Sequence, residues 1–435
     1  MMNYPSPTRS AQESQVTCYR FPSGFLWGAA TSSHQVEGNN VANDWWEFEQ
    51  AGRLPYRSGE ACRHWDLYEQ DFELARSLGH NAHRFSIEWS RVEPAEGRWS
   101  EEAIAHYRAV VAALLRRGIE PVVTLHHFTH PAWFARRGGW LGRDAAASFA
   151  RYAERMAAEL PGVRYWLTLN EPTVWTRLAY MVGEWPPCVR GAWPKAVRVL
   201  WSQARAHVVA YQALHASAPA ARVGLAHNVP CIQPCDPRRR RDRLAARARD
   251  LLLNDAFLYI IGALPAGGRR GGRHLDFLGI NYYTRSVVRG GTRGRALVLG
   301  DECTPRHHPD HGPLSDIGFE VYPAGLLAVL QKFSTLRRPL LVTENGIATT
   351  DEALRTVFVH EHLVALGEAV RRGLDVIGYL YWSLIDNFEW ALGTTPRYGL
   401  TAVDYRTQAR VPRPAAELYA RVCRSHELVD PPGPL

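Results

Sequence analysis

The chain of 435 residues contains 46% hydrophobic and 22% charged residues, and its formal net charge is +8. This balance is typical of a globular protein with a large core and argues against an intrinsically disordered chain. The length would allow two or three domains, but barrels with an outer layer of helices reach this size as one domain, so we expect a single domain.

The sequence lacks several features that would indicate a particular cellular compartment or binding partner. Residues 1–18 contain no apolar run of the length that a signal peptide needs, and no run of about 18 apolar residues indicates a membrane span. We therefore expect a cytoplasmic protein without a membrane partner. The seven cysteines form no CxxC pair and are expected to be reduced thiols. The arginine-rich run 238–243 lacks interleaved aromatic residues, so we interpret it as the solvated start of a helix and expect no nucleic-acid partner.

Short β-rich segments alternate with amphipathic helical patterns along the chain, and no linker divides them. The β-rich segments are apolar and mostly non-alternating, as expected for parallel strands that are covered on both faces. Eight strands are predicted, at residues 25–30, 81–87, 120–127, 163–169, 222–227, 275–283, 338–344 and 375–384. The longer helical patterns lie at residues 101–117, 144–160, 194–216, 243–261 and 351–372.

The number and order of these segments predict an α/β protein built as a single (β/α)8 TIM barrel. We place the barrel at residues 21–427, after a flexible N-terminal segment at 1–20 and before a C-terminal tail at 428–435. An open doubly wound sheet would show the same alternation, but the sequence contains neither a GxGxxG motif nor a Walker loop to support it.

Two glutamates stand where predicted strands end, which is where the active site of such a barrel lies. Glu171 follows the fourth strand and Glu344 ends the seventh, so their carboxylates can face each other across the barrel mouth. Cleavage of a glycosidic bond requires such a pair, because one carboxyl group protonates the leaving oxygen while the other attacks the anomeric carbon or activates water. Each glutamate alone could instead cap the helix that follows it. The amide and aromatic residues at the other strand ends favour the catalytic interpretation.

Seven motifs along the chain resemble, in order, those of glycoside hydrolase family 1, the β-glucosidase family. They are FLWGAATSSHQVEG (25–38), HRFSIEWSRVEP (83–94), TLHHF (124–128), TLNEP (168–172), DFLGINYYT (276–284), VTENG (342–346) and YWSLIDNFEWALG (381–393). The resemblance spans residues 21–422 and implies a retaining enzyme on a (β/α)8 fold. It also implies that Glu344 is the nucleophile and that Glu171 is the general acid/base.

The same resemblance implies the surroundings of both carboxylates. Arg84 and the hydroxyl of Tyr283 are expected beside Glu344, where they would favour its ionised form. Glu171 must hold its proton near neutral pH, which the negative charge of Glu344 would promote. Asn170 is expected to bind the sugar 2-OH. Because adjacent strand residues point to opposite faces, Asn170 and Glu171 can both reach the site only if residues 169–171 form a bulge or kink.

Sugar recognition is likewise inferred from the resemblance. Glu389 would repel a phosphate group, which predicts an unphosphorylated sugar. Phe128 stands where the family usually has a tryptophan that donates to the 3-OH, so selectivity at O3 should loosen. A cis peptide is predicted between Trp382 and Ser383. The substrate-binding residues implied are Gln35, His127, Asn170, Asn281, Glu389, Trp390 and Tyr398, with Trp382 beneath the sugar ring.

The favoured function is thus a retaining β-glucosidase that hydrolyses terminal, unphosphorylated β-D-glucosides, with some activity on β-fucosides or β-galactosides. The alternatives are a transglycosylating β-glucosidase and a catalytically silent carbohydrate-binding barrel, although the presence of both glutamates argues against the second. The expected partner is a small-molecule β-glycoside, and the oligomeric state is left open. No cofactor is expected. The segment HHPDH (307–311) has metal-binding residue types without a regular ligand spacing, so no metal site is predicted.

Overall fold

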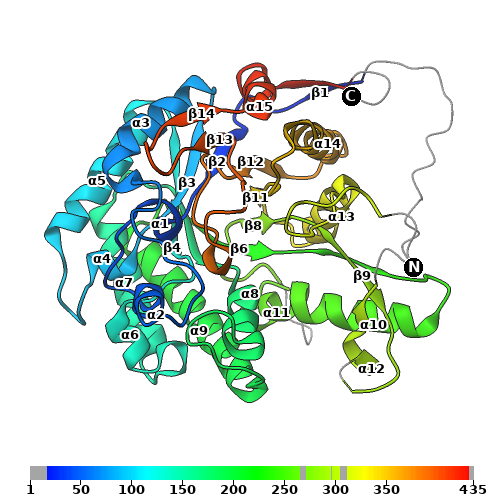
Figure 1. The fold of residues 1–435 in the computed structure, drawn as a ribbon, viewed down its shortest axis with the longest axis horizontal. Helices are drawn as coiled ribbons and strands as arrows, with labels where there is room; N and C mark the ends of the chain where they lie inside the picture. Colours follow the sequence, from blue (N-terminus) through cyan, green and yellow to red (C-terminus); the bar gives the residue numbers. More distant parts are fainter. Residues whose placement is uncertain (1–16, 265–270, 295, 304–310, 431–435) are drawn as a thin grey trace.

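A computed structural model describes residues 17–264, 271–294, 296–303 and 311–430. Eight parallel strands form a closed barrel in which each strand pairs with the next one along the chain, and β12 pairs with β2 to complete the ring (Figure 1). The (β/α)8 prediction is therefore confirmed, and the open doubly wound sheet is excluded. The barrel strands are β2 (Leu26–Ala30), β3 (Ala82–Ser86), β4 (Glu120–His126), β5 (Tyr165–Asn170), β6 (Arg222–Asn228), β8 (Leu278–Asn281), β11 (Leu340–Asn345) and β12 (Val376–Trp382).

Helices surround the barrel, and shorter ones lie in the loops (Figure 1). The longer helices are α3 (His64–Ser77), α5 (Glu101–Arg116), α7 (Ala145–Glu159), α9 (Trp193–Ser217), α10 (Arg240–Asp250), α13 (Pro323–Ser334), α14 (Glu352–Arg371) and α15 (Pro414–Ser425). The shorter ones are α1 (Ser33–Val36), α2 (Asp44–Gln50), α4 (Trp89–Val92), α6 (Ala132–Arg136), α8 (Pro172–Thr176), α11 (Ala256–Ile260) and α12 (Ala296–Leu299). Two 3-10 turns, η1 (Gly139–Leu141) and η4 (Trp390–Leu392), and two π-helical turns, η2 (Arg177–Val182) and η3 (Leu251–Asp255), complete the helical segments of the described residues.

Helix starts follow from local sequence. The Ser100 side chain accepts a hydrogen bond from the backbone N–H of Ala103 and so caps α5. Asp351 caps α14 by accepting from Ala353 and Leu354. The arginine-rich run is exposed at its start and leads into α10, as predicted.

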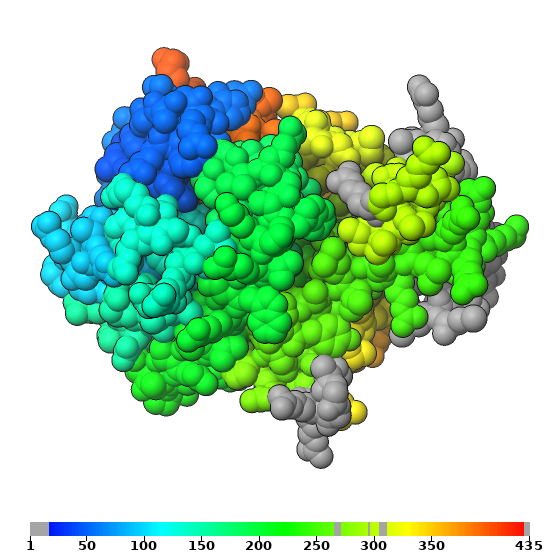
Figure 2. Space-filling view, turned by 90° about the horizontal axis from the view of Figure 1, so that it is seen from below, coloured from blue at the N-terminus to red at the C-terminus, as the bar shows by residue number. Residues whose placement is uncertain are grey.

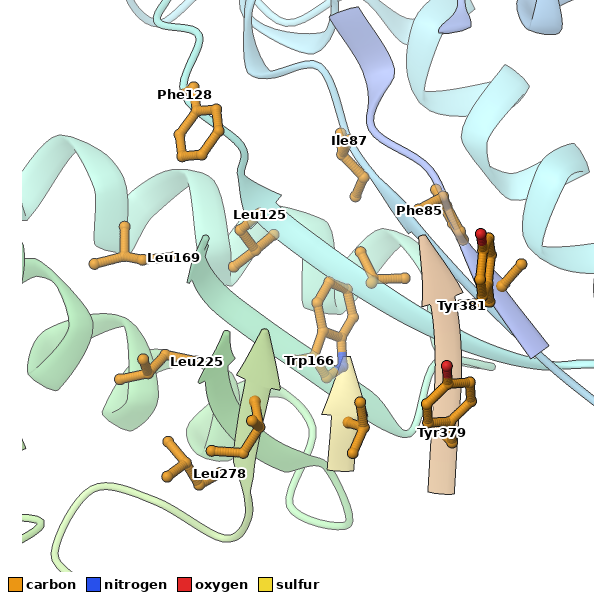
Figure 3. Close-up of a cluster of buried hydrophobic side chains, with 14 of the residues drawn as sticks. Phe85, Ile87, Leu125, Phe128, Trp166, Leu169, Leu225, Leu278, Tyr379 and Tyr381 are labelled. Carbon is orange, nitrogen blue, oxygen red and sulfur yellow. The ribbon is translucent and has the colours of Figure 1, made fainter. Parts of the chain in front are cut away.

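Side chains fill the barrel interior and the layer outside it. The inner cluster takes mainly small and aliphatic residues, such as Leu26, Ala82 and Leu380, together with the aromatic rings of Tyr165 and Phe277. A larger cluster packs the outer strand faces against the helices, and Figure 3 shows Trp166, Tyr379 and other side chains of this layer. The barrel is therefore a packed support for its loops and not an open channel.

The two ends of the described chain are paired. Strand β1 (Thr17–Arg20) runs antiparallel to β15 (Glu427–Asp430), beside α15. The predicted boundaries are corrected accordingly, because residues 17–20 are not a flexible segment and residues 428–430 are not a tail. Their backbone hydrogen bonds are satisfied by each other, a long-range pairing that four-residue segments do not reveal in the sequence.

The cysteines were expected to be reduced, and five of them carry free thiols, namely Cys18, Cys62, Cys188, Cys231 and Cys423. For the other two the prediction is wrong. Cys235 and Cys303 form a disulfide. They flank a three-stranded sheet of β7 (Cys231–Pro234), β9 (Arg285–Arg289) and β10 (Asp301–Glu302), which brings together two residues that are 68 positions apart. A two-stranded sheet of β13 (Thr401–Val403) and β14 (Arg410–Pro412) follows the barrel.

Two further observations apply only to the described residues. No helix among them combines the length and apolar character needed to cross a membrane. No group of three or more His, Cys, Asp or Glu side chains among them could hold a metal ion. Most of the HHPDH segment lies outside the described residues, and its last member, His311, pairs with Glu320.

Candidate active site

The predicted site residues lie within the barrel strands or in the loops that follow their carboxyl ends. Direct contacts join them into one network, except that Gln35 and Glu389 form a separate hydrogen-bonded pair beside Trp390. The set comprises Gln35, Arg84, His127, Asn170, Glu171, Asn281, Tyr283, Glu344, Trp382, Glu389, Trp390 and Tyr398.

The end of β5 has the predicted irregularity. The pairing of β5 with β6 shifts register between Leu167 and Asn170, and Glu171 has a left-handed backbone with φ of 44°. The Thr168 hydroxyl contacts His207 of α9, and Leu169 packs in the outer cluster. Two consecutive side chains therefore face the helices, and Asn170 and Glu171 both turn toward the barrel mouth.

Glu344 is buried and held by two donors. The guanidinium of Arg84 lies 2.5 Å from Glu344 Oε1, and the Tyr283 hydroxyl donates to Glu344 Oε2 at 2.5 Å. Burial raises the pKa of Glu344, and the Arg84 ion pair and the Tyr283 hydrogen bond oppose that rise. Of the two carboxylates, Glu344 is the one with a cation in contact, so it is the one whose ionised form is stabilised.

Glu171 has different partners. Two amides, from Asn281 and Asn228, donate to Glu171 Oε1 at 2.8 Å and 3.1 Å. Burial raises the pKa of Glu171 to about 8, and the charge of Glu344 adds to the rise. The sequence prediction named the charge of Glu344 as the cause, whereas burial is the larger one. Near neutral pH, Glu171 therefore retains a proton that it can donate.

Asn170 connects the two carboxylates. Its Oδ1 accepts from Arg84 Nη2 at 2.7 Å and from Asn281 Nδ2 at 3.0 Å. Its Nδ2 lies 3.1 Å from His127 Nε2, which must accept the hydrogen bond. Burial and the nearby Arg84 hold the pKa of His127 well below its ordinary value, so this ring is neutral. Its proton is then on Nδ1, a buried atom with no hydrogen-bond partner among the described residues.

A second polar group comes from the first and last barrel loops. Gln35, on α1 after β2, donates from Nε2 to Glu389 Oε2 at 3.1 Å and to Asn387 Oδ1 at 3.0 Å. Burial raises the pKa of Glu389 to about 8, and the charges of Glu344 and Glu171 contribute. An amide and a carboxyl group side by side can donate to and accept from neighbouring hydroxyl groups of one ligand.

Aromatic rings surround these polar groups. The ring of His127 stacks on Trp382 with 5.8 Å between centroids and on Trp390 with 6.1 Å. Phe128 packs against Trp390 and Trp185, and its phenyl ring has no N–H group to donate. The peptide between Trp382 and Ser383 is cis, as predicted. Flat apolar faces next to polar planar groups suit a ring that has both C–H faces and hydroxyl groups.

The sequence prediction missed several residues of this region. Asn228, which contacts Glu171, ends β6 one residue beyond the predicted strand, so a polar residue at a strand end was the available signal. His34 stacks on Trp390, and Trp45 and Trp185 pack against the same indole. His34 lies in α1, Trp45 in α2 and Trp185 after η2, and hydrophobic periodicity within such short elements gives no indication of these contacts.

Comparisons with known proteins identify similar chains. The model of the family "Glycosyl hydrolase family 1" matches residues 17–267 and 272–428. Beta-glucosidase A of Thermotoga maritima is 30% identical, over 94% of this chain and 99% of that protein. A 6-phospho-beta-galactosidase of Staphylococcus aureus is 28% identical, over 94% and 99%. The solved structure of a beta-glycosidase from Pyrococcus horikoshii is 44% identical and superimposes with a TM-score of 0.88, over 95% of this chain and 97% of that one.

Proposed function

The chain is a β-glycosidase that belongs to glycosyl hydrolase family 1, and we propose that it hydrolyses terminal, unphosphorylated β-D-glucosides by double displacement, with Glu344 as nucleophile and Glu171 as acid/base. The observation that carries the proposal is the unequal environment of the two buried carboxylates. Glu344 is paired with Arg84, whereas the side-chain partners of Glu171 among the described residues are the amides of Asn281 and Asn228, and its pKa is about 8. One group is suited to attack and the other to donate a proton.

In the first step, ionised Glu344 attacks the anomeric carbon while Glu171 gives its proton to the leaving oxygen. The bond between the sugar and the aglycone breaks, and an ester between the sugar and Glu344 forms. Tyr283 and Arg84 hold both oxygens of Glu344 before the attack, which fixes the direction of the carboxylate.

In the second step, Glu171 acts as a base. Formation of the ester removes the negative charge of Glu344, which is one of the causes of the raised pKa of Glu171. The pKa of Glu171 then falls, and its carboxylate takes a proton from the water that attacks the anomeric carbon. The sugar is released with its original β configuration, and Glu344 and Glu171 return to their starting protonation states.

The sugar would be held by the groups that have free hydrogen-bonding capacity. Asn170 can donate to the 2-OH, because its Oδ1 is already occupied by Arg84 and Asn281. His127 has an unpartnered Nδ1–H, and Gln35 with Glu389 offers a donor and an acceptor together. Trp382 would support the C–H face of the ring.

The charges around Glu389 disfavour a phosphate group on the sugar. The charged groups that act on Glu389 are the carboxylates Glu344 and Glu171, and both raise its pKa. A sugar 6-phosphate placed there would face the negative charge of ionised Glu344, and no cation of the described residues contacts Glu389 to offset it. Because one relative is a 6-phospho-beta-galactosidase, a 6-phosphorylated sugar is the substrate to compare.

The experiment is hydrolysis of p-nitrophenyl β-glucoside, β-fucoside, β-galactoside and 6-phospho-β-glucoside by the wild type, Glu171→Ala and Glu344→Ala. We expect turnover of the unphosphorylated sugars, with the β-glucoside among the preferred ones, and loss of activity in both variants. A higher kcat/KM for the 6-phospho-β-glucoside would overturn the assignment of the sugar. A folded wild type that cleaves none of the four would favour the silent carbohydrate-binding barrel.

A further inference from the structure

Helix α9 presents an apolar stripe to solvent. Trp193, Val197 and Trp201 are 43%, 53% and 59% exposed. Their spacing of four residues places them above one another on one face of the helix. Single exposed apolar residues are ordinary, but two tryptophans and a valine in line form a patch, and such patches mark interaction surfaces.

A groove runs beside Trp201. Its volume is about 640 Å³, and it lies between η1, the start of α7, α9 and the end of α11. None of the predicted active-site residues lines it. Its apolar lining includes Trp140, Leu141, Ala146, Val208 and Ile260, and three arginines lie along it, namely Arg143, Arg198 and Arg205.

The positive charge along this groove is not neutralised within the described chain. No acidic side chain of the described residues forms an ion pair with any of the three arginines, and α9 contains no aspartate or glutamate. The neighbouring helix α7 differs, because its Arg151 pairs with Glu93 and its Arg155 with Glu159. Asp144, next to Arg143 in the sequence, faces Arg137 instead.

We propose that the stripe and the groove, together called the α9 surface, dock the protein on a membrane that contains anionic lipids. Tryptophan side chains prefer the membrane–water interface, where the indole meets both apolar and polar groups. The three guanidiniums would contact lipid phosphates, and the apolar groove has room for part of an acyl chain. The helix lies on the lower side of the molecule in Figure 1, and its green residues form part of the surface that Figure 2 shows from below.

The positive charge of the three arginines favours a lipid surface over a second copy of this chain as the partner of the α9 surface. Contact between two α9 surfaces would bring together three unpaired arginines from each copy, and like charges repel in a partly dehydrated contact. An anionic lipid surface supplies the opposite charge over the whole patch. The binding is peripheral, because α9 buries its opposite face against the rest of the protein and stays part of the fold.

The experiment is co-sedimentation of the full chain with vesicles of phosphatidylcholine alone and of equimolar phosphatidylcholine and phosphatidylglycerol. We expect binding to the anionic vesicles alone, and loss of that binding at about 1 M salt, where charge interactions are screened. Arg143→Gln/Arg198→Gln/Arg205→Gln should weaken binding on the order of 100-fold, at about fivefold per charge. Trp193→Ser/Val197→Ser/Trp201→Ser should also reduce it.

A matched control removes the same charge elsewhere. Arg98→Gln/Arg406→Gln/Arg421→Gln changes three exposed arginines that lie outside α9 and the groove. This variant should bind vesicles nearly as the wild type does, and all three variants should hydrolyse a soluble nitrophenyl glycoside at the wild-type rate, which shows that they are folded.

Three results would overturn the proposal. The wild type could remain in the supernatant with anionic vesicles. The control variant could lose binding as fully as the groove variant, which would show an effect of net charge alone. Light scattering could show a dimer that the stripe variant dissociates, which would make the α9 surface a contact between copies of this chain.

Discussion

Arg84 is the residue that makes the two active-site glutamates unequal. Its guanidinium is fully buried and contacts Glu344 and Asn170, whereas no cation in the described part of the chain contacts Glu171. Removing one partner of such a buried ion pair is destabilising, because the remaining charge stays buried without compensation.

Replacing Arg84 with methionine should therefore raise the pKa of Glu344, since the cation that lowers it is gone. A higher pKa means that a larger part of Glu344 is protonated at acidic pH, so the acid limb of the kcat/KM profile should move to higher pH. We also expect kcat/KM at neutral pH to fall on the order of 10²–10³-fold. Arg84→Lys keeps the charge and should shift the limb less. An acid limb that stays in place in Arg84→Met would show that Arg84 does not act on Glu344.

The raised pKa of Glu171 can be tested through the pH dependence of the stability of the protein. Its pKa of about 8 in the folded protein lies above the ordinary value of 4.5, so the folded state binds this proton more tightly than the unfolded state does. Stability is then lost as the pH rises through that interval, because the buried group must ionise. Glu171→Gln cannot ionise and should have a higher Tm than the wild type at about pH 8, with the difference vanishing below about pH 4. Equal Tm values across the whole range would contradict the raised pKa.

At the scale of elements, helix α14 holds two loops of the active-site side in place. Its Arg355, which is fully buried, donates to the backbone carbonyls of Ile347 and Thr349 in the loop after β11. It also donates to the carbonyls of Arg397 and Tyr398 in the loop after β12. Both loops carry or adjoin site residues, so Arg355 is a positioning residue for Tyr398.

Arg355→Met leaves several buried carbonyl groups without donors, and we expect the free energy of unfolding to fall by about 2–4 kcal/mol. Chemical denaturation measures this change. Arg355→Lys should recover only part of it, because an ammonium group cannot span all four acceptors. We also expect KM to rise, since the loop that carries Tyr398 loses its anchor. Unchanged stability together with unchanged KM would contradict this role.

Elements differ in how well the sequence predicts them. All eight barrel strands and five of the eight longer helices could be predicted, because buried parallel strands are continuous apolar runs and surface helices are amphipathic. The pattern at 243–261 predicted one helix, whereas the structure has α10, η3 and α11. Lys332 pairs with Asp250 and Asp255 at the two ends of η3, a tertiary contact from α13 that local periodicity does not encode.

More of the active site than of its surroundings could be predicted from the sequence. The bulge at β5 could be predicted because adjacent strand residues point to opposite faces, whereas two adjacent polar residues were both expected to reach the pocket. The register shift at the end of β5 allows both side chains to do so. The layer of His34, Trp45 and Trp185 around Trp390 could not be predicted, since these residues come from α1, α2 and the segment after η2 and meet only in the fold.

At the scale of the whole molecule, closure of the barrel and pairing of the chain ends make one structural unit. Strand β12 pairs with β2, and β1 pairs with β15, so residues from the start and the end of the chain meet twice. Local sequence patterns do not show which distant residues pair, which is why the β1–β15 pair and the disulfide between residues 68 positions apart escaped the sequence prediction while local elements did not. We expect thermal unfolding to be a single transition that coincides with loss of activity. Two separated transitions would contradict a single unit.

The central claim is the assignment of opposite roles to Glu344 and Glu171, and the stereochemistry of azide rescue tests it most directly. Azide is a small nucleophile that can replace water or a missing carboxylate. In Glu171→Ala it should attack the sugar ester of Glu344 and give the β-glycosyl azide, whereas in Glu344→Ala it should attack the β-glycoside itself and give the α-glycosyl azide. Each product is identified by NMR. The reverse pairing of products and variants, or the same azide from both, would contradict the assignment.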